Sequence, residues 1–296
     1  MLAFRWCWLG LVFLFSSIPA QETKKLPLRN FKIAVLSDSL QENSGLGFFG
    51  EKLFTLNDGG NPSELYQINA ENGKIIQTIS IPVPNIDWEA LAFSGNNMYI
   101  GDFGNNRGTR KDLKIYKIPV SSIKIITDSI STVSFYYPEQ KDFTPKNLNN
   151  NYDLEAMIFH ENQLHLFSKA WENKTIVHYT INPNETNLQP AIYNEEFATN
   201  FVVTDAAYHA KKLYLLGYNK KTEAFLMICN ETSSGIFFNE KPQKYYLGST
   251  LFLSQLEGIA VNDTGIYISG EAFHSPLGTK KQTIYHIPFS EFVLNN

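Results

Sequence analysis

Acidic residues recur beside similar apolar runs along this chain, and they are the side chains best suited to chemistry. Glu89, Glu155 and Glu257 each open such a run, as in "EALAFSGNNMYIGD" from Glu89. Carboxylate oxygens suit a hard cation such as Ca²⁺ better than zinc or copper. Two carboxylates about 6 Å apart repel by roughly 3 kcal/mol at an effective dielectric of about 20. If the fold gathers these acids, they need a cation, protonation or hydrogen-bond donors.

Five segments share one pattern, in which a polar start leads to an apolar strand, a polar turn, a second apolar strand and a polar end. The copies are "SGLGFFGEKLFTLND" from Ser44, "EALAFSGNNMYIGD" from Glu89, "EAMIFHENQLHLFSK" from Glu155, "TDAAYHAKKLYLLGY" from Thr204 and "EGIAVNDTGIYISGE" from Glu257. A third apolar strand follows each copy, and a fourth follows most of them. Alternating apolar residues between Gly, Asn and Pro are typical of short antiparallel strands.

Four-stranded units that repeat about every 50 residues predict an all-β, five-bladed β-propeller over residues 21–296. The last copy lacks a fourth strand, and we expect the N-terminal "FKIAVLSD" segment to supply it and close the ring. Residues 137–153 are polar and contain proline, which predicts a surface loop. Six blades are the alternative if that region hides another unit, and an irregular two-domain β protein is a further one.

The blade geometry predicts that these polar residues meet. In antiparallel hairpins, the start of the first strand and the end of the second lie at the same mouth of the channel. The candidate ligand residues at this mouth are Glu89, Glu155, Asp205, Glu257, Asp58, Asp102, Lys169, Tyr218, Glu271 and Arg107. Glu89, Glu155, Glu257 and Asp102 are the candidate metal ligands. In the alternative interpretation, each Glu accepts backbone N–H groups of the next blade and only locks the ring.

Two details of this set are left open by the residues alone. The fourth copy begins "VTDAAY", so either Thr204 or Asp205 takes the place of the Glu. Arg107 and Arg110 lie in the loop "GDFGNNRGTR" (101–110), where they could hold an anion, although an ordinary solvated loop fits the same residues. Lys169 is the only cation at the matching positions, which suits a salt bridge or an anion ligand.

The composition excludes some classes of partner. A formal net charge of −4, with basic residues scattered along the chain, gives no reason to expect nucleic acid. Residues 1–20 combine an early Arg, a short apolar run and small residues, as a secretory signal peptide does. We therefore expect an exported protein, periplasmic or extracellular, with no transmembrane segment in the mature chain. "GLGFFG" at 45–50 matches a dinucleotide-binding pattern but lies inside a β-hairpin, where that motif cannot work.

The stretches "ENSGLGFFGEKLFTLNDGGNPSELYQIN", "DWEALAFSGNNMYIGDFGNN", "YDLEAM" and "QLEGIAV…YISGE" resemble a family of secreted bacterial propellers. These are the SdiA-regulated and phytase-esterase-like β-propeller proteins, and the resemblance runs from about residue 38 to the C-terminus. It implies export, a propeller fold and a Glu-lined channel mouth with calcium as a ligand. The fourth copy departs from the pattern, which puts a complete ring of Glu in doubt.

Three functions fit these observations. The first is a binding protein whose acidic mouth holds Ca²⁺ or a cationic ligand and presents loops to a small molecule, a glycan or another protein. The second is a metal-assisted hydrolase of phosphoesters or other esters, in which a metal-bound water is the nucleophile. The third is a structural or surface-interaction propeller. The sequence assigns no catalytic residue and leaves open whether the protein is an enzyme.

Overall fold

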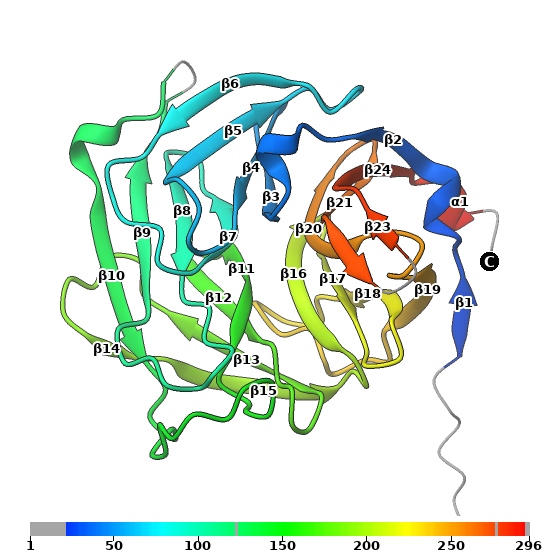
Figure 1. Ribbon diagram of the computed structural model, residues 1–296. Helices are drawn as coiled ribbons and strands as arrows, with labels where there is room; N and C mark the ends of the chain where they lie inside the picture. Colours follow the sequence, from blue (N-terminus) through cyan, green and yellow to red (C-terminus); the bar gives the residue numbers. More distant parts are fainter. Residues whose placement is uncertain (1–21, 122–123, 276–277, 294–296) are drawn as a thin grey trace, which may run out of the picture.

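A computed structural model describes residues 22–121, 124–275 and 278–293 of the protein, whose strands form five antiparallel sheets around a ring (Figure 1). The inner strand of each sheet lines a central channel. These inner strands are β3 (Asn43–Phe49), β7 (Trp88–Phe93), β11 (Leu154–His160), β16 (Val202–His209) and β20 (Gln255–Asn262). Each contacts the next around the ring, and β20 contacts β3, so the circle is closed. The predicted five-bladed propeller is confirmed.

Three more strands complete each blade from the channel outward. The second strands are β4 (Lys52–Asn57), β8 (Asn97–Asp102), β12 (Gln163–Ser168), β17 (Lys212–Tyr218) and β21 (Gly265–Glu271). The third strands are β5 (Glu64–Ile68), β9 (Lys114–Pro119), β13 (Thr175–Ile181), β18 (Glu223–Asn230) and β24 (Thr283–Pro288). The outer strands are β6 (Ile75–Ser80), β10 (Ser131–Tyr136), β15 (Ile192–Ala198), β19 (Gln243–Ser249) and β2 (Lys32–Val35). Within each blade, all neighbouring pairs of these strands are antiparallel.

The ring closes where the two ends of the chain meet in one blade. Strand β2 pairs antiparallel with β24, with Ala34 opposite Ile284 and Val35 opposite Thr283. The "FKIAVLSD" segment therefore supplies the fourth strand of the last blade, as predicted. Closure in this way pairs an edge that an open array of blades would leave exposed.

Short elements decorate the blades. Strand β1 (Thr23–Lys25) pairs parallel with β19, and β14 (Gln189–Pro190) pairs parallel with β10. The remaining elements are the hairpin β22 (Phe273–Ser275) with β23 (Gly278–Lys280), the 3₁₀ turns η1 (Leu28–Phe31), η2 (Asp38–Leu40) and η3 (Thr127–Ser129), and the helix α1 (Ser290–Val293). In the described part of the chain, no helix has the length and apolar character needed to cross a membrane.

The hydrophobic core is divided into five clusters, one at each junction between neighbouring blades. At the junction of the first two blades, for example, Leu56 packs with Trp88 and Met98. Each strand contributes alternate side chains to the clusters on its two faces, as its pleat requires. The blades are thus held to each other by apolar burial.

Residues 137–153 contain no strand or helix, in agreement with the predicted surface loop. The loop is anchored to the loop after β8. Gln140 donates to the backbone oxygen of Gly108, and Leu148 N donates to that of Asn106. The predicted signal peptide, residues 1–20, lies outside the described residues.

Candidate functional site

The three predicted Glu residues occupy equivalent irregular positions in their inner strands. Where each inner strand pairs with the second strand, the register shifts by one residue near the strand start. The skipped residues are Gly45, Glu89, Glu155, Thr204 and Glu257. A β-bulge of this kind leaves one residue unpaired and redirects its side chain. The fold thereby places Glu89, Glu155 and Glu257 in the wall of one cavity.

The bulges also show which residues replace Glu in the other two blades. Thr204 holds the position in the fourth blade, and its hydroxyl donates to the backbone oxygen of Leu256 at 2.8 Å. Gly45 holds it in the first blade with a positive φ of 59°, and a Cβ there would lie 3.1 Å from the backbone oxygen of Glu89. The close approach of the neighbouring inner strand therefore explains why the first blade carries glycine.

The polar mouth of the channel is a cavity of about 310 Å³. Its lining residues are Ser44, Asp58, Glu89, Asn106, Leu148, Glu155, Lys169, Trp171, Tyr218, Gln255, Glu257 and Glu271. Seven of the ten candidate ligand residues from the sequence are in this set. Among the described residues, Asp102, Asp205 and Arg107 do not line the cavity.

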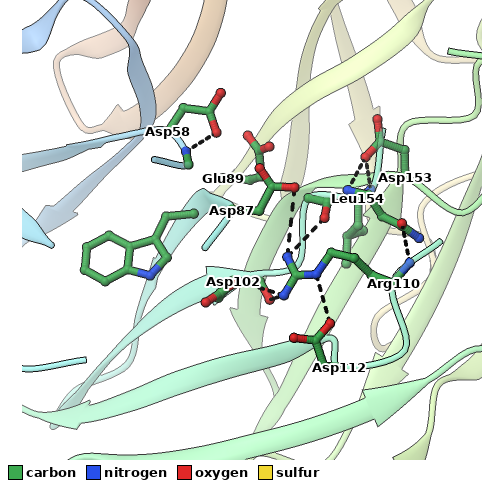
Figure 2. A network of polar contacts seen from close by, with 12 residues as sticks. Asp58, Asp87, Glu89, Asp102, Arg110, Asp112, Asp153 and Leu154 are labelled. Atoms are coloured by element: carbon green, nitrogen blue, oxygen red, sulfur yellow. Dashed lines mark hydrogen bonds and ion pairs between the residues drawn. The ribbon is translucent and has the colours of Figure 1, made fainter. Parts of the chain in front are cut away.

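One half of the mouth is an acidic cluster of Asp58, Asp87 and Glu89, which we call the acid trio (Figure 2). One carboxylate oxygen from each lies within 4.8 Å of the others. Gly59 and Gly104 border this space. A Cβ at Gly104 would lie 2.4 Å from Glu89 Oε1 and 2.5 Å from Asp87 Oδ2. Glycine at this position is what lets two carboxylates converge there.

Glu89 is the least satisfied member of the trio. It is only 4% exposed. Its carboxylate has one hydrogen-bonding contact within the described residues, the Ser44 hydroxyl at 3.4 Å from Oε2. That hydroxyl is closer to the backbone oxygen of Glu89, at 2.9 Å, and it has a single proton to donate. The buried carboxylate thus has almost no donor from the protein.

Burial and mutual repulsion raise the pKa values of the acids in this mouth. Burial is the main cause for Asp58, whose pKa is raised to about 7, and for Asp87, whose pKa is raised to about 6. Burial together with the charges of Asp58 and Glu155 raises the pKa of Glu89 well above its usual range. Burial together with the charges of Glu257 and Asp58 raises the pKa of Glu271 to about 9. Without a cation, protons held by Glu89 and Glu271 at neutral pH reduce the repulsion among these groups.

The other half of the mouth contains its own cation. Lys169 forms a buried ion pair with Glu155, and its ammonium lies 5.2 Å from the ring centre of Trp171 and 5.6 Å from that of Tyr218. Burial lowers the pKa of Lys169, but Glu155 and the surrounding groups raise it by more than burial lowers it. The pKa of Lys169 is therefore well above its usual value. Lys169 is therefore a tethered positive charge, as the salt-bridge alternative for this residue predicted.

An amide bridges the two remaining acids of this half. Gln255 Nε2 lies 2.8 Å from Glu257 Oε1 and 2.6 Å from Glu271 Oε1, so it donates to both. Tyr218 also hydrogen-bonds Glu257. These contacts distinguish Glu155, Glu257 and Glu271 from Glu89, because each of the three has a strong donor or a cation beside it.

The structure directs Asp102 away from the mouth and toward Arg110 (Figure 2). The Arg110 guanidinium contacts Asp102 at 2.9 Å and Asp112 at 3.1 Å, and it approaches Asp87 to 3.9 Å. It also donates to the backbone oxygen of Gly104 at 3.1 Å. Arg110 thus clamps the 101–110 loop and leaves no free guanidinium for an anion. Arg107 is exposed, which corrects its predicted place at the mouth.

Asp205 has a structural role instead of facing the cavity. It is fully buried, and its carboxylate accepts from its neighbour Ala206 N at 2.8 Å and from Ile259 N of the next inner strand at 2.7 Å. The backbone of Leu46, one strand further round, also hydrogen-bonds it. Asp205 therefore locks three inner strands together, which is the role that the alternative interpretation assigned to the Glu residues.

Six residues of this site were absent from the ten predicted ones: Ser44, Asp87, Asn106, Leu148, Trp171 and Gln255. Asp87 is two positions before Glu89, and Trp171 is two positions after Lys169, so each follows the alternation of an extended chain. That spacing was a signal that could have found them. Asn106 and Leu148 reach the mouth only because two loops fold over it. The sequence contains no signal for that contact.

Comparisons with known proteins leave the function open. No family model matches the chain, and no curated protein matches it, so the resemblance to SdiA-regulated and phytase-esterase-like propellers stays a prediction. Among solved structures, YjhT is 11% identical with a TM-score of 0.43, covering 86% of this chain and 75% of that one. A putative 6-phosphogluconolactonase from Bacteroides uniformis is 11% identical with a TM-score of 0.39, covering 86% and 72%.

A third similar structure is the tail fiber of Staphylococcus aureus phage P68, at 10% identity and a TM-score of 0.46. It covers 91% of this chain, which spans only 55% of the fiber chain. Likeness at this level carries no argument about this chain, and propellers host many unrelated functions. The function must therefore be argued from the site.

Proposed function

We propose that the protein is a binding module whose acid trio holds a divalent cation, with Ca²⁺ the best fit. The observation that supports this most is Glu89. Its carboxylate is buried, faces two other carboxylates and receives almost no hydrogen bond from the protein. A buried charge of this kind needs a partner. A cation would supply it.

The donor set fits calcium. Asp58, Asp87 and Glu89 offer only carboxylate oxygens, and Ca²⁺ takes six to eight oxygen ligands, including water, at about 2.3–2.6 Å. Gly59 and Gly104 keep side chains out of the space beside these oxygens. Bound Ca²⁺ would offset both the burial and the mutual repulsion that raise the three pKa values, and open coordination positions would face the cavity.

Lys169 explains why we place one ion and not two in this mouth. Its ammonium already compensates Glu155, and Gln255 bridges Glu257 with Glu271. The half of the mouth formed by the third, fourth and fifth blades is thus supplied with a cation and donors by the chain itself. The acid trio is supplied less well: Arg110 reaches only Asp87, at 3.9 Å, and Gly59 N donates to Asp58. Glu89 has neither a cation nor a strong donor beside it.

We also propose a class of ligand for the cavity and a cellular location for the protein. A cavity of about 310 Å³ with an aromatic side, Trp171 and Tyr218, and neutral polar groups suits a small molecule, a glycan residue or a side chain of another protein. Export rests on the residues 1–20, which have the character of a signal peptide. The mature protein would then lie in the periplasm or outside the cell.

The alternative function of phosphoester or ester hydrolysis is less well supported. A phosphate ester would need cationic side chains free to contact it. The cavity's only lysine or arginine among its described lining residues is Lys169, which is paired with Glu155, and Arg110 is engaged by Asp102 and Asp112. A purely structural role suits Asp205 but leaves the unsatisfied Glu89 unexplained.

Isothermal titration calorimetry with Ca²⁺ at pH 8 tests the proposal. We expect the wild type to bind one ion per chain. In Glu89→Gln, which keeps the shape of the side chain and removes its charge, the dissociation constant should be at least tenfold larger. Glu71→Gln changes an exposed carboxylate in a turn and serves as the control, with unchanged affinity. Absence of binding heat in the folded wild type, or equal affinities in Glu89→Gln, would refute the cation site.

A further inference from the structure

A second group of metal-type ligands lies at the opposite end of the blades, where β11 and β18 finish. His160 ends β11, Glu161 begins the following turn and Glu231 follows β18. His160 Nε2 lies 2.7 Å from Glu231 Oε1 and 4.0 Å from Glu161 Oε1. One ligand atom from each residue fits within 4.8 Å of the others. We call these three residues the lower cluster.

The lower cluster is far from the acid trio. Glu155 and His160 are five residues apart on the same inner strand, which separates them by about 16 Å at 3.3 Å per residue. The two groups therefore lie toward opposite ends of the inner strands. A cation bound at one would not share ligands with the other.

Neighbouring groups of the protein hold Glu231 and His160 in place. Glu231 accepts the Tyr208 hydroxyl proton on Oε2 and the Gly235 N–H on Oε1 at 2.8 Å. The His160 ring packs on the Tyr208 ring, with 4.2 Å between ring centres. Hydrogen bonds of this type orient metal-binding carboxylates, and packing fixes the imidazole edge that faces them.

The charges of the lower cluster are incompletely balanced. Two carboxylates approach one imidazole, and in the described part of the chain neither forms an ion pair with a lysine or arginine. The side chain of Glu231 is only 10% exposed, whereas that of Glu161 is 49% exposed. Glu161 can therefore adjust its position, and water or a ligand atom can reach a bound ion from its side.

We propose that His160, Glu161 and Glu231 form a site for a divalent transition-metal ion, with Zn²⁺ as the best-matched ion. One imidazole nitrogen and two carboxylate oxygens are a donor set that zinc accepts, with a fourth position left to water or a ligand. Calcium prefers oxygen donors, so the imidazole separates this site from the acid trio by chemistry as well as by position.

Zinc at this site would also connect two blades. His160 and Glu161 belong to the third blade, and Glu231 belongs to the fourth. The ion would replace the proton shared by His160 and Glu231 and would tie the loop after β18 to the end of β11. Because zinc would bind the folded chain and not the unfolded one, it would raise the thermal stability of the protein.

The test measures Zn²⁺ binding by calorimetry in a Glu89→Gln background, which removes the acid trio as a competing site. We expect one Zn²⁺ per chain, with affinity at least tenfold weaker in His160→Gln and in Glu231→Gln. Glu161→Gln changes a half-exposed side chain that the fold does not need, and it should also weaken binding. Glu71→Gln is the control and should match the background.

Absorption of Co²⁺ in place of Zn²⁺ gives an independent measurement. Visible bands of a four- or five-coordinate ion should appear with the background chain and disappear with Glu161→Gln or His160→Gln. Because Glu161→Gln preserves the fold, misfolding of another variant does not remove the test. Zinc affinity unchanged by Glu161→Gln and by His160→Gln, or no zinc binding by the folded background protein, would overturn the proposal.

Discussion

The two ends of the channel are built from the same five inner strands, yet they have opposite chemistry. At the acidic mouth, each inner strand has a bulge, and three of the five bulge residues are glutamates. Toward the other end, the strands pair regularly with their neighbours, and the channel narrows to an apolar cavity of about 120 Å³. Met157, Phe159 and Ile259 are among its lining residues.

The difference shows how one architecture separates stability from binding. Regular pairing at the apolar end buries side chains against each other, which stabilises the ring. The bulges at the other end interrupt the ladder and turn charged side chains into the channel, where burial is unfavourable without a partner. We therefore expect substitutions of the side chains that line this apolar cavity to change stability alone, and substitutions at the acidic mouth to change binding and pH dependence.

The largest expected effect is that of Lys169→Met. Removing the ammonium leaves Glu155 buried without its cation, which should cost about 3–5 kcal/mol of unfolding free energy. Urea unfolding at pH 8 measures this loss. At pH 5 the loss should be smaller, because Glu155 can take up a proton. Lys244→Met is the control, since that ammonium donates to the backbone oxygen of Thr199 and should show no such pH dependence. Equal losses at the two pH values would contradict the assigned role of Lys169.

The next effect is expected at the apolar end. Met157→Ala removes a fully buried side chain and should lower the unfolding free energy by about 2–5 kcal/mol. Ca²⁺ affinity, measured by calorimetry on the folded variant, should equal that of the wild type. A clear loss of Ca²⁺ affinity would show that the two ends of the channel are energetically coupled, which would contradict the separation of stability from binding.

The acidic mouth should make the metal-free protein less stable as the pH rises. The pKa of Asp58 is about 7 and that of Glu271 about 9 in the folded state, compared with about 4 in an unfolded chain. Raised folded-state values mean that the stability contribution is fully present below about pH 4 and is lost as the pH rises through 7 and 9. The melting temperature, measured with chelator, should therefore fall from pH 6 to pH 9.

Bound Ca²⁺ and the removal of a carboxylate charge should both reduce this fall in melting temperature. Saturating Ca²⁺ should raise the melting temperature more at pH 8 than at pH 6, because binding competes with protons. Glu89→Gln should flatten the pH dependence in the presence of chelator, and Glu71→Gln should leave it unchanged. A melting temperature with chelator that rises between pH 6 and pH 9 would contradict the raised pKa values.

The smallest effect is expected for Arg107→Ala, and it contrasts with that of Arg110→Ala in the same 101–110 loop. Arg107→Ala should change the unfolding free energy by no more than about 0.5 kcal/mol, as exposed substitutions do. Arg110→Ala should cost more, because it leaves the fully buried Asp102 without its ion pair. Denaturant unfolding of the two variants compares them directly. A larger loss for Arg107→Ala would contradict the described contacts of this loop.

The sequence predicted the ring because the repeat is a local pattern. Alternating apolar residues and turn residues determine each hairpin, and five copies leave one blade short of a strand, which the N-terminal segment fills. The convergence of Glu89, Glu155 and Glu257 followed from the same repeat, because equivalent positions in equivalent blades must face the same mouth.

The remaining site depends on contacts between segments far apart in the chain. Asp102 and Asp58 occupy matching places in their repeats, but Arg110 draws only Asp102 away from the mouth. Asp205 is adjacent to the bulge position, and a shift of one residue turns its carboxylate from the cavity to backbone N–H groups. Neither the bulges nor the choice between Arg107 and Arg110 has a marker in a single sequence.

Diffraction from crystals grown with Ca²⁺ at pH 8 tests the central claim most directly. Our account predicts an anomalous difference peak among Asp58, Asp87 and Glu89, with carboxylate oxygens of all three residues about 2.3–2.6 Å from it. No peak there in a well-ordered mouth, or a Ca²⁺ ion bound elsewhere with the trio empty, would contradict the proposal that this mouth is a cation-binding site.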